Sequence, residues 1–335
     1  MTNNLPAVSV VMVVHNAGEF LAPAVRSVLG QDWQDLEVIL FDNGSTDGAV
    51  EALLTAVNDP RMRVCRESVN HGIVEATNRA TALARGCFVA VMDHDDVALP
   101  TKISRQVAWL ENHPEAGGVG ACTRLIDHAG RELGGDFTLE AAEEYRAFTA
   151  FSQSANFGSH LFRRDVIAAF PRRGLFPFSS DFDFVARAVE QRSIVALPEV
   201  LFQYRVHPGQ TTQIRRREQR AAEGIIRILT AKRRSGEIEP ITQAKGWLTE
   251  IQAAGDAAAI LRACSRRCLA CNLPYLAAYH ARRSLGAAPG PGNLAAAILL
   301  CLRAMSANPR TAAASANLFL RGPLAALRLN PWPRR

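Results

Sequence analysis

The sequence lacks the apolar runs and the leader segment that mark membrane-spanning and secreted proteins. It contains no uninterrupted run of about 18 apolar residues, and its best stretch, 293–302, spans roughly half of a bilayer. The opening MTNNLPAVSV has neither a basic segment nor a long apolar segment of the signal-peptide kind. We therefore expect a cytoplasmic protein, either soluble or attached peripherally at the inner face of the membrane.

The cysteines do not suit a disulfide framework, because they are seven in number and unevenly spaced. We expect reduced thiols. Residues 264–271, CSRRCLAC, have the C-x3-C-x2-C spacing of the cluster-binding loop in radical enzymes that use S-adenosylmethionine. Here that spacing lies in a helical pattern and puts the three side chains on one helix face, so we expect small buried apolar residues.

Two glycine motifs that bind nucleotides are also absent. No G-x-G-x-x-G follows the first expected strand, which argues against a dinucleotide site of the Rossmann type. No G-x-x-x-x-G-K-[ST] occurs, which excludes a P-loop. A nucleotide bound to this chain would have to be held by carboxylates and a metal ion.

Charge is divided unevenly along the chain, whose formal net charge is +6. Residues 1–204 carry 17 Lys+Arg against 26 Asp+Glu, and residues 205–335 carry 21 against 6. After Asp256 no acidic residue follows, while 11 arginines remain. The two parts of the chain are therefore expected to face different partners.

Residues 7–112 alternate between continuous β-branched runs and segments with helical spacing. Continuous runs are typical of strands buried on both faces, and we expect them at 7–16, 36–45, 61–68 and 87–93. Helices are expected at 19–31, 47–57, 72–86 and 100–112, the last with Pro100 in its first turn. This order predicts an α/β fold with a mostly parallel, doubly wound sheet and helices on both of its faces.

After residue 113 the alternation becomes less regular. Further strands are expected at 116–127 and 159–167, and a further helix at 181–191. From 213 onward the chain is rich in Ala, Leu and Arg with helical spacing, interrupted by proline-containing stretches. We therefore expect an α/β domain of residues 1–212 followed by an all-helical domain of residues 213–335.

Polar clusters fall where three expected strands end, at 15–16, 42–47 and 93–96. Ligands of doubly wound sheets bind beyond the carboxyl ends of the strands, so these clusters predict one binding site. In the second cluster, DNGSTD, Ser45 or Thr46 would suit a helix cap, while Asp42 would suit hydrogen bonds to a nucleotide base or ribose.

The third cluster, DHDD, places Asp93 and Asp95 directly after a buried strand, where both carboxylates can face one small cation. Mg²⁺ and Mn²⁺ prefer oxygen ligands and are commonly held by carboxylates together with substrate phosphates. Such an ion would offset the repulsion among the aspartates and neutralise charge on a leaving diphosphate. The alternative is a solvated loop in which Asp95 or Asp96 caps helix 100–112.

Four stretches resemble, in order, family 2 glycosyltransferases of the GT-A fold: VSVVMVVHNAGEFLAPAVRSVLGQ, LEVILFDNGSTDG, NHGIVEATNRATALARGCFVAVMDHDD and SSDFDFVARAVEQ. The resemblance covers residues 8–212. It implies a nucleoside-diphosphate-sugar donor, with UDP-sugars favoured, Mn²⁺ or Mg²⁺ as cofactor, and inversion at the anomeric carbon. The Q-x-x-R-W signature of processive polysaccharide synthases is absent, so we expect one transfer per encounter.

The resemblance also assigns residues to the donor site. It places Asn16 and Glu19 at the end of the first nucleotide-binding strand, and Asp42, with Asn43 beside it, at the base. Asn78 matches an asparagine on a helix near the donor.

The same resemblance assigns the metal site. Asp93 and Asp95 match the D-x-D pair, with Asp93 near the ribose and the metal and Asp95 as the direct ligand. In the stretch FQYRVHPGQTT, His207 is expected to bind the metal or the diphosphate, and Arg205 to add positive charge to the donor site. A lone histidine is also commonly structural, so that alternative stays open for His207.

Asp181 matches the family's general base, which takes the proton of the acceptor hydroxyl as it attacks the sugar. Alternatively, Asp181 or Asp183 is only favourable charge in the first turn of a helix. The chain departs from the family pattern at Ser180, where glutamate is usual. It also departs at His15, in place of tyrosine, and at Thr77, in place of arginine.

Taken together, the sequence predicts a metal-dependent inverting glycosyltransferase of polysaccharide biosynthesis that acts on a saccharide or lipid-linked glycan. The alternative is a non-catalytic GT-A-like module that binds a nucleotide-sugar or a glycan, which Ser180 favours. Sugar-nucleotidyl transfer would need a glycine-rich N-terminal loop, which is missing.

The C-terminal arginines leave several partners open. An anionic membrane surface suits apolar segments whose only charges are arginines. Helix packing or homodimer formation suits them equally well, whereas no motif for nucleic acid accompanies them.

Overall fold

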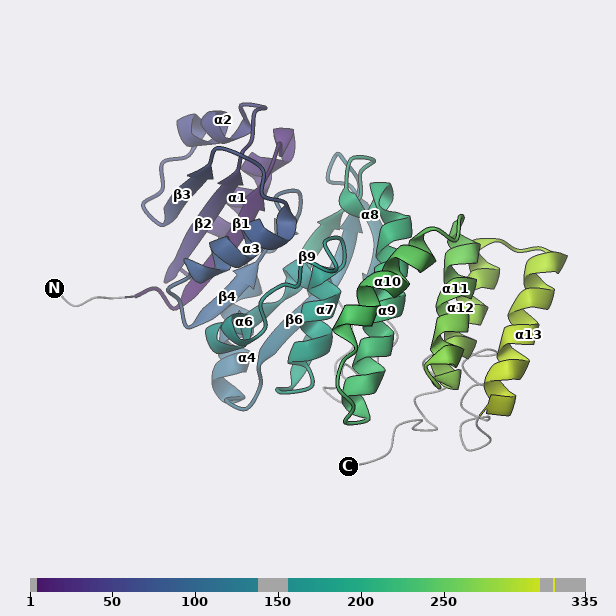
Figure 1. The fold of residues 1–335 in the computed structure, drawn as a ribbon. Helices are drawn as coiled ribbons and strands as arrows, with labels where there is room; N and C mark the ends of the chain where they lie inside the picture. Colours follow the sequence, from purple (N-terminus) through teal and green to yellow (C-terminus); the bar gives the residue numbers. More distant parts are fainter. Residues whose placement is uncertain (1–4, 138–155, 308–315, 317–335) are drawn as a thin grey trace. The chain divides into compact units, whose positions relative to one another are not determined.

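The computed structural model describes residues 5–137, 156–307 and Ala316, which belong to two compact units (Figure 1). Unit 1 contains the described residues 5–137 and 156–210, and unit 2 contains residues 211–307 and Ala316. That residues 1–212 and 213–335 are separate domains stays a prediction.

Unit 1 is built on a nine-stranded sheet with the order β3-β2-β1-β4-β8-β6-β9-β5, and β7 pairs with β6. The strands are β1 Val8–Val14, β2 Leu36–Asn43, β3 Met62–Glu67, β4 Phe88–Val91, β5 Val97–Ala98, β6 Gly118–Ile126, β7 Glu132–Phe137, β8 Leu161–Arg163 and β9 Ile194–Arg205. Strands β1 to β4 are parallel, as are β6 and β9. The antiparallel pairs are β4–β8, β6–β8, β6–β7 and β5–β9.

Helices cover both faces of the parallel strands (Figure 1), which confirms the predicted doubly wound arrangement. They are η1 Gly18–Phe20, α1 Leu21–Leu29, α2 Ala49–Ala56, α3 Ile73–Ala82, α4 Lys102–Asn112, η2 Phe157–Ser159, α6 Arg164–Ala169 and α7 Ser180–Ala188. Side chains of α1, α2 and α4 join one core cluster, and those of α3, α6 and α7 join the other.

Strand β1 shows why its sequence is apolar at every position except Ser9, whose hydroxyl donates a hydrogen bond to Glu37 (2.7 Å). Val10 and Met12 belong to the core cluster on one face of the sheet, and Val11 and Val13 belong to the cluster on the other. Successive side chains of a strand point to opposite faces, so a strand covered on both sides has no polar face. Burying each such side chain stabilises the fold by roughly 1.5–3 kcal/mol.

Two expectations about element bounds are wrong. The stretch 159–167 is not one strand, because β8 ends at Arg163 and α6 begins at Arg164. Val166 and Phe170 pack against the same core cluster, and this spacing of four residues is that of a helix. Pro100 lies before α4 instead of in its first turn, since Thr101 is the N-cap residue.

Unit 2 is helical in its described part, with α8 Thr211–Ile214, α9 Arg216–Arg234, α10 Ile241–Gln252, α11 Ala257–Ala270, α12 Pro274–Ala287 and α13 Pro291–Ala307. Helix α11 packs against α9 and α12, and α12 packs against α13. The Asp256 carboxylate accepts a hydrogen bond of 2.8 Å from Ala259 N and so caps α11. The Asn293 side chain donates to the backbone oxygens of Ser284 and Ala288 and fixes the turn between α12 and α13.

The face of α11 that carries Cys264 and Cys268 is buried, as expected from their spacing, and Cys271 lies at the C-cap of the helix. Burial raises the pKa of the Cys264 thiol to about 12, which fits an inert apolar residue. None of the helices in the described ranges combines the length and the apolar character needed to span a bilayer.

Candidate active site

The polar clusters of unit 1 meet at one edge of the sheet because the strands that precede them are parallel neighbours. Val14 at the end of β1 is in register with Asp42 on β2, and Val11 is in register with Val91 at the end of β4. The chain leaves β1, β2 and β4 at this edge. The predicted polar clusters therefore do meet at the carboxyl ends of these strands, and binding of a ligand there stays a prediction.

The loops after β1 and β2 hold each other in place through Asn16. Its backbone N–H donates to Ser45 Oγ (3.1 Å), and its Oδ1 accepts from Thr46 N (2.9 Å). Asn16 adopts a positive φ of 53°, a region that asparagine tolerates better than most residues. The N-cap of α2 is Gly48, so neither Ser45 nor Thr46 caps this helix.

Asp42 and Asn43 are almost completely buried, with 5% and 2% of their surface exposed. Asp42 Oδ1 accepts a hydrogen bond of 2.9 Å from Ser45 N. The Asn43 amide donates to Asn70 Oδ1 (2.9 Å) and accepts from His71 N (3.0 Å), which fixes the loop after β3. Contact of either side chain with a nucleotide stays a prediction.

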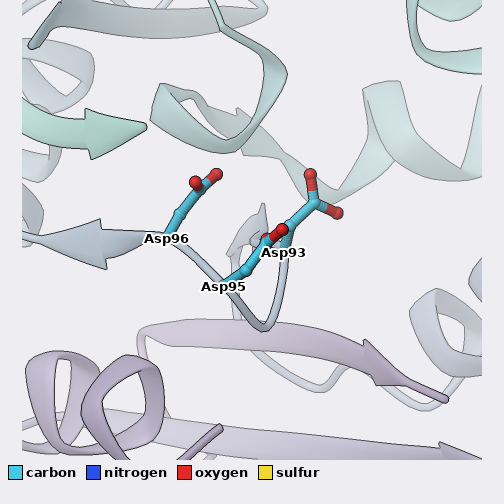
Figure 2. Close-up of side chains that lie close together, drawn as sticks. All are labelled: Asp93, Asp95 and Asp96. Atoms are coloured by element: carbon cyan, nitrogen blue, oxygen red, sulfur yellow. The ribbon is translucent and has the colours of Figure 1, made fainter. Parts of the chain in front are cut away.

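The acidic cluster comprises Asp93, Asp95 and Asp96 on the loop between β4 and β5 (Figure 2). One carboxylate oxygen of each lies within 4.8 Å of the others. Asp93 is exposed, Asp95 is half-buried and Asp96 is completely buried. The sequence assigns the metal to Asp93 and Asp95 and leaves Asp96, in the same cluster, as a possible helix cap. The structure brings an Asp96 carboxylate oxygen close to the other two, and neither Asp95 nor Asp96 caps α4.

The cluster concentrates negative charge that the protein only partly compensates. Burial raises the pKa of Asp96 well above its usual value, and the charges of Asp95 and Asp93 add to the rise. Lost hydration raises the pKa of Asp93 to about 6, with repulsion from Asp95 as the second cause. Asp93 keeps exposed surface, so a cation could reach it from the solvent. The positive charge of a bound cation would offset the repulsion between Asp93 and Asp95 and so lower the pKa of Asp93.

Arg205, the last residue of β9, and His207, just after the strand, both reach this loop. His207 Nε2 lies 3.0 Å from Asp95 Oδ2, so the structure brings the two predicted metal ligands together. Arg205 is 6% exposed, and its backbone N–H donates to Asp96 Oδ1 (2.9 Å). Its guanidinium donates to the backbone oxygens of Asp95 (2.8 Å) and His128 (2.9 Å). Arg205 thus braces the acidic loop.

Glu19 lies at the exposed rim of this region. Its Oε1 is 3.4 Å from His128 Nε2. The ring of Phe20 packs against His128 and His207 with centroid distances of 4.9 and 4.8 Å, and the Arg205 guanidinium lies 5.1 Å from its centroid. These contacts hold the loops that carry the predicted site residues.

Helix α7 places Asp181, the predicted general base, and Asp183 in different surroundings. Asp183 is completely buried and forms ion pairs with Arg187 (3.0 Å) and Arg173. It is therefore a structural charge. Asp181 lies in the first turn of the same helix and is close enough to Asp93 for their charges to interact.

Asn78 is placed next to Arg172, a residue that sequence reasoning missed. The Asn78 side chain accepts from Arg172 N (2.8 Å) and donates to Arg172 O (3.1 Å). Charge interactions connect the Arg172 guanidinium to Asp181 and Asp93. The only sequence signal was the pair of arginines after Pro171, which resembles any basic surface turn.

A divalent cation such as Mn²⁺ or Mg²⁺ fits the acidic cluster. The three carboxylates offer oxygen ligands, which hard cations prefer. Asp96 Oδ2 is buried and has no hydrogen-bond partner among the described residues, which is costly unless a ligand satisfies it. Asp95 and Asp93 would contribute the accessible ligands.

Comparison with known proteins agrees with this geometry. Residues 9–172 match the family model described as glycosyl transferase family 2. Over these residues, the chain belongs to this family. An uncharacterized glycosyltransferase of Haemophilus influenzae is 25% identical over 64% of this chain and 70% of its own length.

Other relatives are matched over less of their length. An uncharacterized protein of Sinorhizobium fredii, y4gI, is 30% identical over 68% of this chain but only 25% of its own length. The putative glycosyltransferase EpsE of Bacillus subtilis is 32% identical over 38% of this chain and 47% of its own length. The chain thus spans half or less of these two relatives.

Solved structures show the fold. TarS from S. aureus in complex with UDP-GlcNAc has a TM-score of 0.57 and 14% identity, covering 95% of this chain and 89% of that one. The mannosyltransferase PcManGT from Pyrobaculum calidifontis, in complex with GDP-Man and Mn²⁺, has a TM-score of 0.53 and 18% identity, covering 99% and 88%. This family 2 chain has the predicted GT-A fold.

Proposed function

We propose that the protein is a metal-dependent inverting glycosyltransferase that moves a sugar from a nucleoside-diphosphate-sugar to a saccharide or lipid-linked glycan. The observation that carries this proposal is the acidic cluster of Asp93, Asp95 and Asp96 at the carboxyl ends of parallel strands, with Asp181 within range of its charge. The family membership and the donors bound by TarS and PcManGT support a nucleotide-sugar as the donor.

The donor would lie along this edge of the sheet. Asn16, Glu19, Asp42 and Asn43 would line the nucleotide side, and Asp93 and Asp95 with His207 would hold Mn²⁺ or Mg²⁺. A bound divalent cation supplies charge neutralisation for the diphosphate that leaves. Arg205 would act indirectly, because its guanidinium is occupied by backbone oxygens of the loops at the site.

Asp181 would be the general base. The acceptor hydroxyl oxygen forms a bond to the anomeric carbon while the bond from that carbon to the diphosphate oxygen breaks on the opposite face. The hydroxyl proton passes to an Asp181 carboxylate oxygen, and the nucleoside diphosphate leaves with the electron pair. This single displacement inverts the anomeric centre and needs one carboxylate as the base. A positioned general base typically raises the rate by about 10²–10⁴.

The test separates binding from chemistry in one variant. Thermal shifts with UDP, GDP and dTDP in the presence of Mn²⁺ identify the donor base, and Asp181→Asn should retain that binding while transfer falls by about 10²–10⁴. Asp165→Asn is the matched control, because Asp165 is a mostly exposed aspartate paired with Arg192 (2.9 Å). Absence of nucleotide binding by the wild type would refute the proposal.

A non-catalytic nucleotide-sugar-binding or glycan-binding module is the second candidate, favoured by Ser180 in the position where glutamate is usual. The same experiment decides between the two. A wild type that binds the donor with Mn²⁺ but shows neither transfer nor donor hydrolysis would support the binding module.

The partners of unit 2 belong to this proposal as well. We expect contact with an anionic membrane surface, which would bring the enzyme to a lipid-linked acceptor. Helix α13 supports this, since four of its large apolar side chains are exposed, those of Leu294, Ile298, Leu299 and Leu302. A homodimer through the same face is the alternative.

A further inference from the structure

Arg172 is an arginine without a carboxylate partner in a place crowded with carboxylates. Its guanidinium is close enough to Asp181, Asp93 and Asp183 to interact with their charges. Among the residues that the structure describes, none of these carboxylates forms an ion pair with it. Among the described residues, its guanidinium makes one hydrogen-bond contact, from Nη1 to Ser180 Oγ, which is weak at 3.4 Å.

The neighbouring arginines show what a structural arginine looks like here. Arg173 and Arg187 both pair directly with the buried carboxylate of Asp183. Arg172 differs, because the charges around it are near but not in contact. A guanidinium has five N–H donors in a planar fork. In the described part of the chain, only Ser180 contacts one of those of Arg172, so the other donors are available to a ligand.

The position of Arg172 is fixed from two sides. Its backbone N–H and C=O both bond to the Asn78 side chain, at 2.8 and 3.1 Å. Its guanidinium carbon lies 4.1 Å from the ring centroid of Phe157 and 5.5 Å from that of Phe184. Stacking on rings leaves the edge of the guanidinium, where the N–H groups lie, available to a ligand.

We propose that Arg172 is a substrate-binding residue that takes an anionic oxygen group of the donor, and that Asn78 is its positioning residue. The inference rests on the proposed function. The anionic oxygens have two sources, the diphosphate of the donor or a carboxylate on the transferred sugar. Ser180 matters for this role. A glutamate at this position would neutralise the positive charge of Arg172, whereas the serine hydroxyl does not.

Binding by Arg172→Gln tests the proposal with three probes in the presence of Mn²⁺. The probes are the nucleoside diphosphate that the wild type binds best, its neutral hexose derivative and the corresponding uronic acid derivative. We expect at least a tenfold loss of affinity. A loss with all three probes assigns Arg172 to the diphosphate, and a loss confined to the uronic acid derivative assigns it to a sugar carboxylate.

Two further variants keep Arg172 in the chain and protect the test against misfolding. Ser180→Glu should weaken the same probe by a similar factor, because the new carboxylate would pair with the guanidinium. Asn78→Ala should weaken it by a smaller factor, since it only loosens the backbone that carries Arg172. Arg79→Gln is the control, because Arg79 is exposed on α3 and paired with Glu75 (2.9 Å).

The outcomes are distinct. Wild-type affinity for every probe in folded Arg172→Gln and Ser180→Glu would overturn this inference while leaving the glycosyltransferase proposal intact. A wild type that binds no nucleoside diphosphate would overturn the glycosyltransferase proposal, and the inference with it.

Discussion

At the scale of single residues, neighbours decide whether a charge stabilises the fold or serves the site. Glu37 is 3% exposed, yet its carboxylate accepts hydrogen bonds from Ser9 Oγ (2.7 Å) and from the Arg85 guanidinium (2.8 and 3.0 Å). Burial would raise the pKa of Glu37, but these hydrogen bonds outweigh it and lower the pKa. The acidic cluster has no comparable set of cationic partners, so its charge is available to a ligand.

A buried histidine gives this protein a pH-dependent stability. His160 is completely buried, and burial lowers its pKa from 6.5 to about 4, although contacts with the backbone oxygens of Phe157 and Asn156 oppose this. Below pH 6.5 the His160 imidazole is protonated in the unfolded chain, whereas in the folded chain it stays neutral until the pH falls to about 4. We therefore expect stability to fall between these pH values, by about 3 kcal/mol in total, and to show no contribution from His160 above pH 7.

Urea unfolding of the wild type and of His160→Gln between pH 8 and pH 4 checks this. The variant should be less stable at pH 7, and its deficit should shrink as the pH falls. A deficit that stays constant over the whole range would contradict the role assigned to His160.

At the scale of elements, close backbone approach decides which glycines are irreplaceable. Gly44 and Gly48 have nearly equal positive φ values, 77° and 76°. A Cβ on Gly44 would lie 2.7 Å from the carbonyl carbon of Val69, whereas a Cβ on Gly48 would have no heavy atom within 4 Å. Both substitutions strain the backbone, but only the first pushes the loop after β2 into the loop after β3.

We expect Gly48→Ala to cost about 1 kcal/mol of unfolding free energy, from backbone strain alone. Gly44→Ala should cost about 2 kcal/mol more, because the backbone of two loops must move. It should also weaken nucleotide binding, since the displaced loop contains Ser45, whose backbone N–H donates to Asp42 at the end of β2. Urea unfolding and thermal shift with nucleotide measure both effects, and equal costs for the two variants would refute the explanation.

In unit 2 the packing of α9 on α11 depends on a glycine facing a cysteine. A Cβ on Gly224 would overlap with the Sγ of Cys264. Gly224→Ala should therefore destabilise the protein by about 2 kcal/mol through overpacking. The double variant Gly224→Ala/Cys264→Ala should recover at least about 1 kcal/mol relative to the sum of the single variants. If the losses of unfolding free energy in the two single variants simply add in the double variant, the contact between residues 224 and 264 does not limit how closely α9 and α11 pack.

At the scale of the whole molecule, charge is the property that divides the chain. The part from residue 205 onward carries 21 basic against 6 acidic residues, and the exposed apolar side chains of α13 belong to it. We expect the protein to sediment with vesicles that contain phosphatidylglycerol, less with phosphatidylcholine vesicles, and less at high salt.

Replacement of Leu294, Ile298, Leu299 and Leu302 by serine should reduce vesicle binding at least tenfold without affecting nucleotide binding. Leu54→Ser is a control, because Leu54 is an exposed leucine of α2 in unit 1. Equal sedimentation of wild type and variant would exclude this face. A loss of dimers by the variant, with no vesicle binding by either protein, would favour the homodimer.

Sequence alone predicted most of the architecture and the edge of the sheet where the candidate site lies. A strand buried on both faces has no polar face, so β1, β2 and β4 were predictable from their mainly apolar runs. Parallel strands end at one edge, so the clusters after them had to converge. By contrast, 164–169 appeared to continue a strand, because six residues contain too few turns to show helical spacing.

Tertiary structure alone decided the roles of individual side chains. Asp181 and Asp183 are alike in sequence, but the fold buries Asp183 completely and pairs it with Arg173 and Arg187. Arg172 and Asn78 are 94 positions apart along the chain, and nothing in either local sequence predicts that one positions the other. Spacing along the chain fixes which residues share an element or a strand end, because local geometry is periodic. Which charges are in contact depends on distances between elements, and only the folded chain sets those.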